Sequence, residues 1–372
     1  MEKRKLGRTG LETSILGFGA FHLLEILYRD AESLLNSYLD AGGNYIDTAL
    51  CYGDGESERK IGKAISRRRS EYILASKSDS RDKKGFLSDL DRSLEHLDTD
   101  YIDIMIMHAV GKPEALRSIL GPEGALEGFF SAKRQGKVGH VGISVHGQAD
   151  ILIEALRQYP FDVVMSSINY YDRFNFPEIE EELYPLTQKE EAAIVLMKPV
   201  ADGFLWRSAP QAFRYAFSQP VSVVLAGINT PEMLEADLRY ASEFVPMSDS
   251  EKEELYRTAP ELGNYVCRQC GNCQPCPEGL SIREIFRLEG CFDRQMLTGT
   301  VKDPGDYALR KRLRYWYANS QKAVDRYEQL EVKADRCTGC NACTPKCPYS
   351  IDIVRKLEMV DYKIRMYGKD YY

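Results

Sequence analysis

The chain has 372 residues, of which 44% are hydrophobic and 28% are charged, and its formal net charge is -7. This length exceeds what one ordinary core accommodates, so two domains are expected. The acidic balance argues against nucleic-acid binding, which needs a basic face. No apolar run is long enough to span a membrane and no secretory leader follows Met1, so we expect a cytoplasmic protein without membrane partners.

Short apolar strands alternate with helices along most of the chain, after a small hairpin expected over residues 3–15. Asp30 is predicted to cap the first helix, which ends at Gly42-Gly43. The predicted strands are residues 16–19, 45–48, 72–77, 101–108, 138–144, 161–167, 193–198 and 221–226. Eight such repeats predict a (β/α)8 barrel. A doubly wound open sheet is the alternative, but no G-x-G-x-x-G follows the first strand.

Chemically distinctive residues stand at or just after the ends of these strands, where barrel active sites lie. They are Asp47, Lys77, His108, Ser144, Asn169, Lys198 and Gly227. Tyr52 follows Asp47 in the same loop, and Cys51 beside it is expected to line the pocket. A lysine ammonium favours the phenolate of a nearby tyrosine, and an aspartate keeps that lysine charged. Asp47, Tyr52, Lys77 and His108 therefore indicate a general acid for carbonyl reduction, with His108 orienting the oxygen.

Several blocks of the sequence resemble the aldo-keto reductase family over roughly residues 3–245. The similar blocks are KLGRTGL at 5–11, YIDTA at 45–49, YG at 52–53, SE at 57–58, SK at 76–77, His108, GIS at 142–144, KP at 198–199 and PVSVVLAG at 220–227. The resemblance implies a (β/α)8 barrel, NAD(P)H-linked reduction of a small carbonyl or oxidation of an alcohol, and Asp47, Tyr52, Lys77 and His108 as the catalytic tetrad. It also implies dinucleotide contacts from Gly19, Asp47, Ser144, Asn169, Lys198, Gly227, Asn229 and Glu235.

The sequence departs from the family pattern around the expected dinucleotide. Val145 stands where relatives commonly carry asparagine, and Met165 stands where they carry a glutamine that faces the nicotinamide. Residues 228–235 contain no lysine or arginine, and Glu235-Ala236-Asp237 replaces the usual Glu-Asn pair. A phosphate clamp without cations lacks its main attraction. Selectivity for NADPH is therefore not predicted.

Nine of the ten cysteines follow residue 260, and eight of these stand at ligand spacing. The first run is C-x2-C-x2-C-x2-C-P at 267–277, and the second is C-x2-C-x2-C-x3-C-P at 337–348. The second is the bacterial ferredoxin pattern, in which the fourth cysteine ligates the other cluster. The predicted ligands of one [4Fe–4S] cluster are Cys267, Cys270, Cys273 and Cys347, and those of the other are Cys337, Cys340, Cys343 and Cys276. A pair of four-thiolate zinc sites is the alternative, although the third cysteine and the trailing Cys-Pro argue against zinc.

The predicted domains are the barrel over residues 1–262 and a mostly helical ferredoxin-like domain over residues 263–372. This tail resembles the ferredoxin-like extension found in one branch of the family. A helical insert is expected over residues 281–330. The aromatic residues expected to shield the clusters within it are Tyr307, Tyr315, Trp316, Tyr317 and Tyr327.

Two functional interpretations follow. Clusters pass single electrons and a nicotinamide passes a hydride, so coupling them needs a converter such as flavin. The first interpretation is an oxidoreductase whose clusters serve structure, redox sensing or exchange with a ferredoxin-like partner. The second is an electron-transfer or docking module whose barrel has lost nicotinamide turnover. A barrel-bound flavin fed by the clusters is also left open, since barrels bind flavin phosphate without a short motif.

Overall fold

The structure is a computed structural model that describes residues 1–147, 149–296 and 319–367. The contacts divide the chain into two units. The first unit consists of Met1–Ile168, Glu178–Pro199 and Phe213–Pro246. The second consists of Asn169–Pro177, Val200–Ala212 and Met247–Tyr372, so two of its segments come from loops shortly after barrel strands.

The first unit is a closed barrel of parallel strands in the order β10-β3-β4-β5-β6-β7-β8-β9. The strands are β3 (Leu16–Gly19), β4 (Tyr45–Asp47), β5 (Ile73–Ser78), β6 (Ile102–Met107), β7 (Val138–Val145), β8 (Val163–Ser167), β9 (Ala193–Met197) and β10 (Val223–Gly227). Every predicted strand is present, with ends shifted by at most two residues. The (β/α)8 barrel is confirmed, and the open-sheet alternative is wrong because β10 pairs with both β9 and β3.

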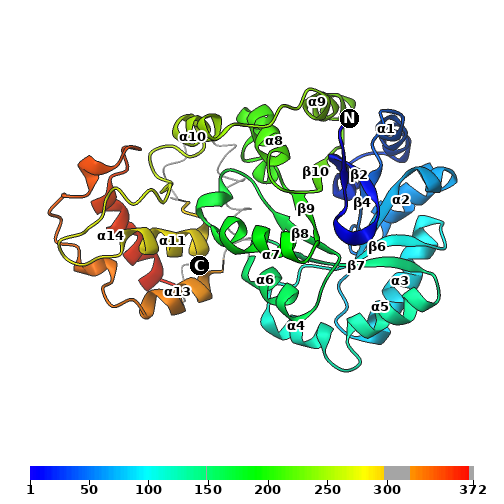
Figure 1. The fold of residues 1–372 in the computed structure, drawn as a ribbon, viewed down its shortest axis with the longest axis horizontal. Coiled ribbons are helices and arrows are strands. Elements are labelled where there is room, and N and C mark those ends of the chain that lie inside the picture. Colours follow the sequence, from blue (N-terminus) through cyan, green and yellow to red (C-terminus); the bar gives the residue numbers. More distant parts are fainter. Residues whose placement is uncertain (148, 297–318, 368–372) are drawn as a thin grey trace. The chain divides into compact units, whose positions relative to one another are not determined.

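Helices surround these strands (Figure 1). They are α1 (Tyr28–Asp40), α2 (Glu56–Ile65), α3 (Lys83–Leu97), α4 (Pro113–Leu120), α5 (Ala125–Arg134), α6 (Ala149–Gln158), α7 (Tyr184–Lys189), α8 (Ala209–Phe217) and α9 (Pro231–Ser242). The prediction that Asp30 caps α1 is wrong. The cap position is Leu27, which makes no side-chain capping bond, and Asp30 lies in the first turn. A carboxylate there still stabilises the helix through the positive end of the helix dipole.

The predicted hairpin is confirmed, and it closes the amino-terminal end of the barrel. Strand β1 (Lys3–Lys5) pairs antiparallel with β2 (Glu12–Ser14). Leu6 in the turn is fully buried among the side chains that fill the barrel interior. Gly7 has a left-handed φ of 53°, and a Cβ at this residue would lie 2.5 Å from the backbone nitrogen of Ala193. With that end closed, the carboxyl ends of the strands form the accessible rim.

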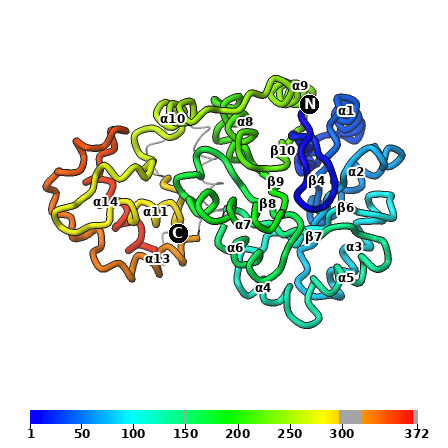
Figure 2. The backbone as a smooth tube through the Cα atoms, viewed as in Figure 1, coloured from blue at the N-terminus to red at the C-terminus, as the bar shows by residue number. Residues whose placement is uncertain are grey.

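The second unit contains α10 (Asp249–Thr258), α11 (Ile282–Asp293), α13 (Ser320–Glu328) and α14 (Ile353–Arg365). Helices α13 and α14 both pack against α11 (Figure 2). Ser248 begins α10 with a capping box to Glu251, as a serine followed three residues later by glutamate predicts. Tyr327 is fully buried in the core of this unit, which also contains Cys273 and Cys343. The other aromatic residues expected to shield clusters lie outside the described residues: Tyr307, Tyr315, Trp316 and Tyr317. None of the described helices is both long and apolar enough to cross a membrane.

Candidate functional site

Strand register brings the predicted tetrad to one rim of the barrel. Asp47 is the last residue of β4 and pairs with Gly19 on one side and Ala75 on the other. Lys77 lies one residue before the end of β5. His108 directly follows β6, and its backbone nitrogen donates to the carbonyl of Ser78 at 2.9 Å. Since parallel strands share their carboxyl edge, these side chains enter the same mouth.

Lys77 forms hydrogen bonds with two other members of the tetrad. Its Nζ donates to Asp47 Oδ1 at 2.6 Å, to the carbonyl of Thr48 at 2.5 Å and to the Tyr52 hydroxyl at 3.3 Å. The side chains of Lys77 and Asp47 are only 2% and 5% exposed. Burial opposes the ammonium charge, but Asp47 and Tyr52 outweigh burial and hold the pKa of Lys77 above its ordinary value. A charged lysine is therefore fixed beside the phenol.

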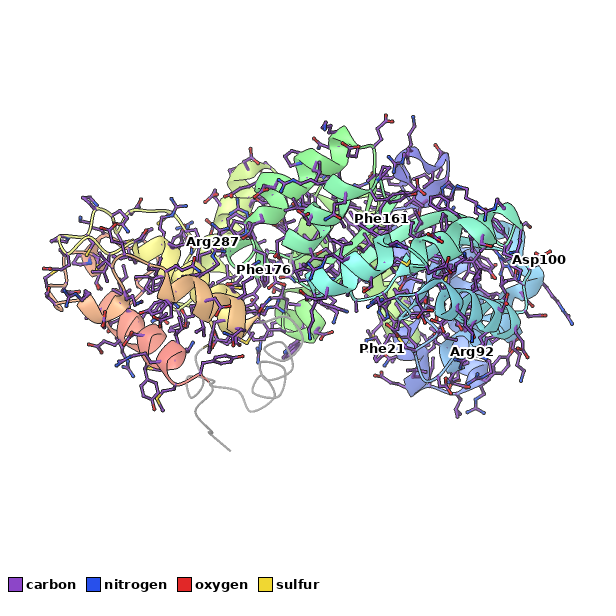
Figure 3. The ribbon with its side chains drawn as sticks, turned by 90° about the horizontal axis from the view of Figure 1, so that it is seen from below. Phe21, Arg92, Asp100, Phe161, Phe176 and Arg287 are labelled. Atoms are coloured by element: carbon purple, nitrogen blue, oxygen red, sulfur yellow. The ribbon has the colours of Figure 1, made fainter. Side chains whose placement is uncertain are left out.

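Tyr52 lies between two aromatic rings. Phe21, which Figure 3 labels, packs edge-on against it with ring centroids 5.1 Å apart, and the His108 ring lies at 6.0 Å. Burial raises the pKa of Tyr52, and the Lys77 charge lowers it by less. In this structure desolvation outweighs the ammonium, so the pKa of Tyr52 is shifted upward and not toward the phenolate. Tyr52 keeps its proton over the neutral range and can act as a donor.

His108 belongs to a second cluster that includes a residue the sequence did not point to. Its Nδ1 lies 2.9 Å from Asp79 Oδ1 and 3.4 Å from Cys51 Sγ. The hydrogen bond with His108 is the largest cause that lowers the pKa of Asp79. Burial, followed by the nearby Asp79 charge, raises the pKa of the Cys51 thiol to about 12. Cys51 thus lies beside His108, and Asp79 could have been noticed as a further polar residue after β5.

His146 is a second residue that the sequence analysis missed. Burial lowers its pKa to about 3, and the charges of Lys198, His108 and Lys77 add to this effect. The His146 imidazole is therefore neutral, and it lies near the charged side chains at the carboxyl-terminal rim of the barrel. The available signal was its position directly after β7, two residues beyond Ser144. Ser144 itself accepts a hydrogen bond at 2.9 Å from the backbone nitrogen of Ala109, the residue after His108.

The two glycines expected to contact a dinucleotide lie side by side. Gly19 of β3 and Gly227 of β10 are register partners. A Cβ on Gly19 would lie 2.9 Å from the carbonyl oxygen of Ala226, and one on Gly227 would lie 2.4 Å from the His22 ring. A side chain at either position would meet these atoms. Only glycine therefore leaves the backbone here open to the close approach of another group.

The remaining predicted dinucleotide contacts are more scattered. Asn229 Nδ2 donates to Glu25 Oε2 at 2.7 Å. Lys198 follows β9 with a left-handed φ of 61°, and Glu235 is exposed on α9. Asn169 belongs to the second unit, where its Nδ2 donates to Asp172 Oδ2 at 2.8 Å.

The two substituted positions near the expected dinucleotide are buried. Met165 is 1% exposed and packs in the barrel interior, where it offers no amide. Val145 is also 1% exposed, at the end of β7.

The two cysteine runs share one backbone pattern. Gln269 and Gly271 are left-handed in the first run, with φ of 59° and 82°. Gly339 and Asn341 are left-handed in the second, with φ of 72° and 57°. These residues stand two and four positions after Cys267 and Cys337. Such alternation turns successive N–H groups inward and makes the anion-binding concavity typical of iron–sulfur sites.

Cysteines of the two runs lie near enough to shift the pKa of one another's thiols. Burial raises the pKa of Cys267 to about 11, and Cys273 and Cys270 add to the effect. Burial also raises the pKa of Cys273, and Cys270, Cys343 and Cys347 contribute. Cys273 of the first run therefore lies near both Cys343 and Cys347 of the second. The backbone nitrogen of Gln269 also donates to Cys267 Sγ at 3.4 Å, a contact typical of cluster-bound thiolates.

The spacing of the sulfurs bears on which metal group they fit. A tetrahedral zinc with Zn–S bonds of about 2.3 Å brings its sulfurs to about 3.8 Å from one another. In the described residues, which include all eight cysteines of the runs, no three of their sulfurs lie within 4.8 Å of one another. A four-iron cubane holds its thiolates farther apart, because each binds a different corner. The described sulfurs of the two runs therefore do not have the close spacing of a tetrahedral zinc site.

A buried ionic network joins α11 and α14 of the second unit. Glu289, 1% exposed, pairs with Lys356 and Lys363 at 2.5 Å each. Lys363 also pairs with Asp293 at 2.8 Å. Lys356 is near enough to Cys267 for each charge to influence the pKa of the other.

Comparison with known proteins identifies the class of this fold and site. The model of the Aldo/keto reductase family matches residues 15–211. This is more than half of the chain, so the chain belongs to the aldo-keto reductase family and is an oxidoreductase. The cysteine runs lie beyond the matched region.

Relatives and solved structures agree with this assignment. The chain is 30% identical over 217 residues to the uncharacterized oxidoreductase YqkF of Bacillus subtilis, covering 55% of this chain and 67% of that protein. It is 30% identical over 247 residues to L-galactose dehydrogenase of Arabidopsis thaliana, covering 61% and 74%. An aldo-keto reductase from Bacillus halodurans in its holo form aligns with a TM-score of 0.58 at 26% identity, over 68% of this chain and 95% of that chain. An aldo/keto reductase from Klebsiella pneumoniae, in complex with NADP and acetate, has a TM-score of 0.59 at 19% identity over 70% and 96%, which shows the fold alone.

Proposed function

We propose that this chain reduces a small carbonyl compound, or oxidises the corresponding alcohol, with Tyr52 as the general acid or base. The observation that supports this most directly is the Lys77 ammonium bonded to both Asp47 and Tyr52. A bound reduced nicotinamide would supply the hydride to the carbonyl carbon. The oxygen of that carbonyl then needs a proton, and the buried Tyr52 hydroxyl holds one.

The other three tetrad residues are proposed to support proton donation by Tyr52 and to position the substrate. Lys77 stabilises the phenolate left on Tyr52 after proton donation, because the two groups stay in hydrogen-bond range inside a buried site. Asp47 keeps Lys77 charged and in place. His108 is proposed to donate from its ring to the substrate oxygen and so to orient it.

Replacing the phenol tests this proposal. Tyr52→Phe should lower the turnover of test aldehydes by a factor of about 10²–10⁴, since it removes the proton donor alone. Tyr28→Phe is the matched control, because the Tyr28 hydroxyl lies outside the tetrad and donates to the Lys63 carbonyl at 3.1 Å. Both variants are assayed with NADH and with NADPH. Equal turnover in Tyr52→Phe and Tyr28→Phe would overturn the assignment.

The proposed nicotinamide contacts are Gly19, Asp47, Ser144, Asn169, Lys198, Gly227, Asn229 and Glu235. The side-by-side glycines Gly19 and Gly227 support this proposal, since bare backbone permits close approach of a dinucleotide. Calorimetric titration of the protein with NADH and with NADPH tests it. Saturable binding of either dinucleotide is expected, and Gly227→Val should abolish it.

We also propose that the tail holds two [4Fe–4S] clusters with crosswise ligands. One set is Cys267, Cys270, Cys273 and Cys347, and the other is Cys337, Cys340, Cys343 and Cys276. The repeated left-handed positions of the two runs support two similar cluster sites, and the C-x2-C-x2-C-x3-C-P spacing of the second run, as in two-cluster ferredoxins, supports the crosswise pairing. A cytoplasmic setting with a ferredoxin-like partner, poor in oxygen, would suit such clusters.

Paired serine substitutions distinguish crosswise from straight ligation. If ligation is crosswise, Cys270→Ser with Cys347→Ser damages one cluster, and anaerobically purified protein keeps about four irons. Cys270→Ser with Cys276→Ser then damages both clusters, and the iron content falls toward none. Straight ligation reverses these two results. Cys291→Ser, which lies outside both runs, is the control and should keep the iron and sulfide content of the wild type.

A second candidate function is an electron-transfer or docking module without nicotinamide turnover. It is favoured by the buried Met165 and by the absence of any lysine or arginine in residues 228–235. Micromolar binding of NADH or NADPH would count against it. A barrel-bound flavin, which would convert between single electrons and hydride, would appear in the visible spectrum of the anaerobically purified protein.

A further inference from the structure

We propose that Cys51, Asp79 and His108 form a binding site for a divalent cation of the zinc class at the barrel rim. Their sulfur, carboxylate oxygen and imidazole nitrogen all lie within 4.8 Å of one another. His108 Nδ1 is 2.9 Å from Asp79 Oδ1 and 3.4 Å from Cys51 Sγ. Across the part of the chain that the structure describes, no other three such side chains bring their donor atoms together in this way.

The fold sets the spacing of the three donors. Cys51 comes from the loop after β4, Asp79 directly follows β5, and His108 directly follows β6. The backbone bond from His108 to the Ser78 carbonyl ties the last two segments together. Cys51 and Asp79 are exposed while His108 is buried, so a cation can enter from solvent and meet an imidazole held by the barrel.

The donor types select the cation. A thiolate and an imidazole favour zinc over magnesium or calcium, which prefer oxygen ligands. Three protein ligands leave the fourth tetrahedral position to water or to another small ligand, as in open zinc sites. On coordination the Cys51 thiol releases its proton to solvent, and Nδ1 of His108 gives its lone pair to the metal.

The site has a consequence for the tetrad. Without a metal, the His108 ring and the Cys51 thiol both hydrogen-bond to Asp79, and a cation would replace these hydrogens by binding all three donors at once. Metal on Nδ1 places the imidazole hydrogen on Nε2, the tautomer that can donate to a carbonyl oxygen. This consequence rests on the proposed function, whereas the binding of the cation does not.

Calorimetric titration with Zn²⁺ tests the proposal. The full-length protein is first loaded with iron and sulfide under anaerobic conditions, so that the cysteine runs are occupied. One equivalent of Zn²⁺ should bind to the wild type and to the Cys291→Ser control. Cys51→Ser and Asp79→Asn should each weaken binding by about tenfold or more, because even partners of metal ligands contribute about that much. Equal binding by wild type and Cys51→Ser, or no binding by either, would overturn the proposal.

Two further measurements keep this result separate from folding and from the proposed function. Co²⁺ bound in place of Zn²⁺ should give a thiolate charge-transfer band in the wild-type minus Cys51→Ser difference spectrum. Far-ultraviolet circular dichroism of the variants should match the wild type. Tyr52→Phe should bind Zn²⁺ normally although it lacks reductase activity, so failure of the catalytic proposal leaves the metal result intact.

Discussion

Asp237 lies on α9 with 6% of its surface exposed, and burial raises the pKa of its carboxyl to about 7 from an ordinary value of 3.8. The folded state therefore binds a proton that the unfolded state releases, and stability falls as the pH rises through this interval. Below pH 4 the group is protonated in both states and has no effect. Three pKa units correspond to about 4 kcal/mol of lost stability above pH 7, as an upper bound. Asp237→Asn removes the charge and should recover this loss.

The assay is urea unfolding followed by circular dichroism between pH 4 and pH 8, with wild type and variant measured together. The gain in unfolding free energy of Asp237→Asn should increase steadily from pH 4 to pH 7 and then level off. Glu235→Gln, at an exposed position on the same helix, is the control and should give no such rise. A gain that stays constant with pH, or that grows toward acid, would refute the reasoning.

Three other predictions follow from the site and the tail. The protein should bind NADH at least as tightly as NADPH, because residues 228–235 supply no cation for the extra phosphate; tighter NADPH binding in calorimetry would contradict this. Lys77→Met should lower turnover about a hundredfold or more, since Tyr52 loses its charged partner, and a steady-state rate equal to wild type would exclude that role. Glu289→Gln should cost about 3–5 kcal/mol in thermal or urea unfolding, because Lys356 is left buried without its carboxylate. Glu284→Gln, which loses only a half-exposed pair with Arg326, should change stability by about 1 kcal/mol or less, and equal losses would refute the burial argument.

The barrel could be predicted because its strands are short apolar runs whose ends carry polar residues. Asp47, Lys77 and His108 were visible as such ends, and the register of the barrel brings them together. Tyr52 was visible because it follows Asp47 closely in the same loop. The start of α1 was missed because Leu27 occupies the cap position, and a leucine gives no capping signal.

Electrostatic behaviour was harder to predict, because it depends on burial. The sequence suggested that Lys77 would favour the Tyr52 phenolate, but desolvation reverses the net direction of the pKa shift. The contact of Asp79 with His108 depends on a distance across the rim that no spacing along the chain encodes. A single boundary drawn along the chain likewise could not anticipate that segments following β8 and β9 group with the residues from Met247 onward.

The segments that follow β8 and β9 limit where the chain can be shortened or joined to another protein. Tyr171 donates to the backbone of Arg294 at 2.5 Å, and the Arg294 side chain forms a buried ion pair with Asp172. Tyr170 likewise donates to Glu261 at 3.0 Å. A shortened gene that stopped before Met247 would leave these tyrosines and a carboxylate without their counterparts. A chimera that replaced the residues from Met247 onward would therefore also have to replace residues 169–177, which carry their partners.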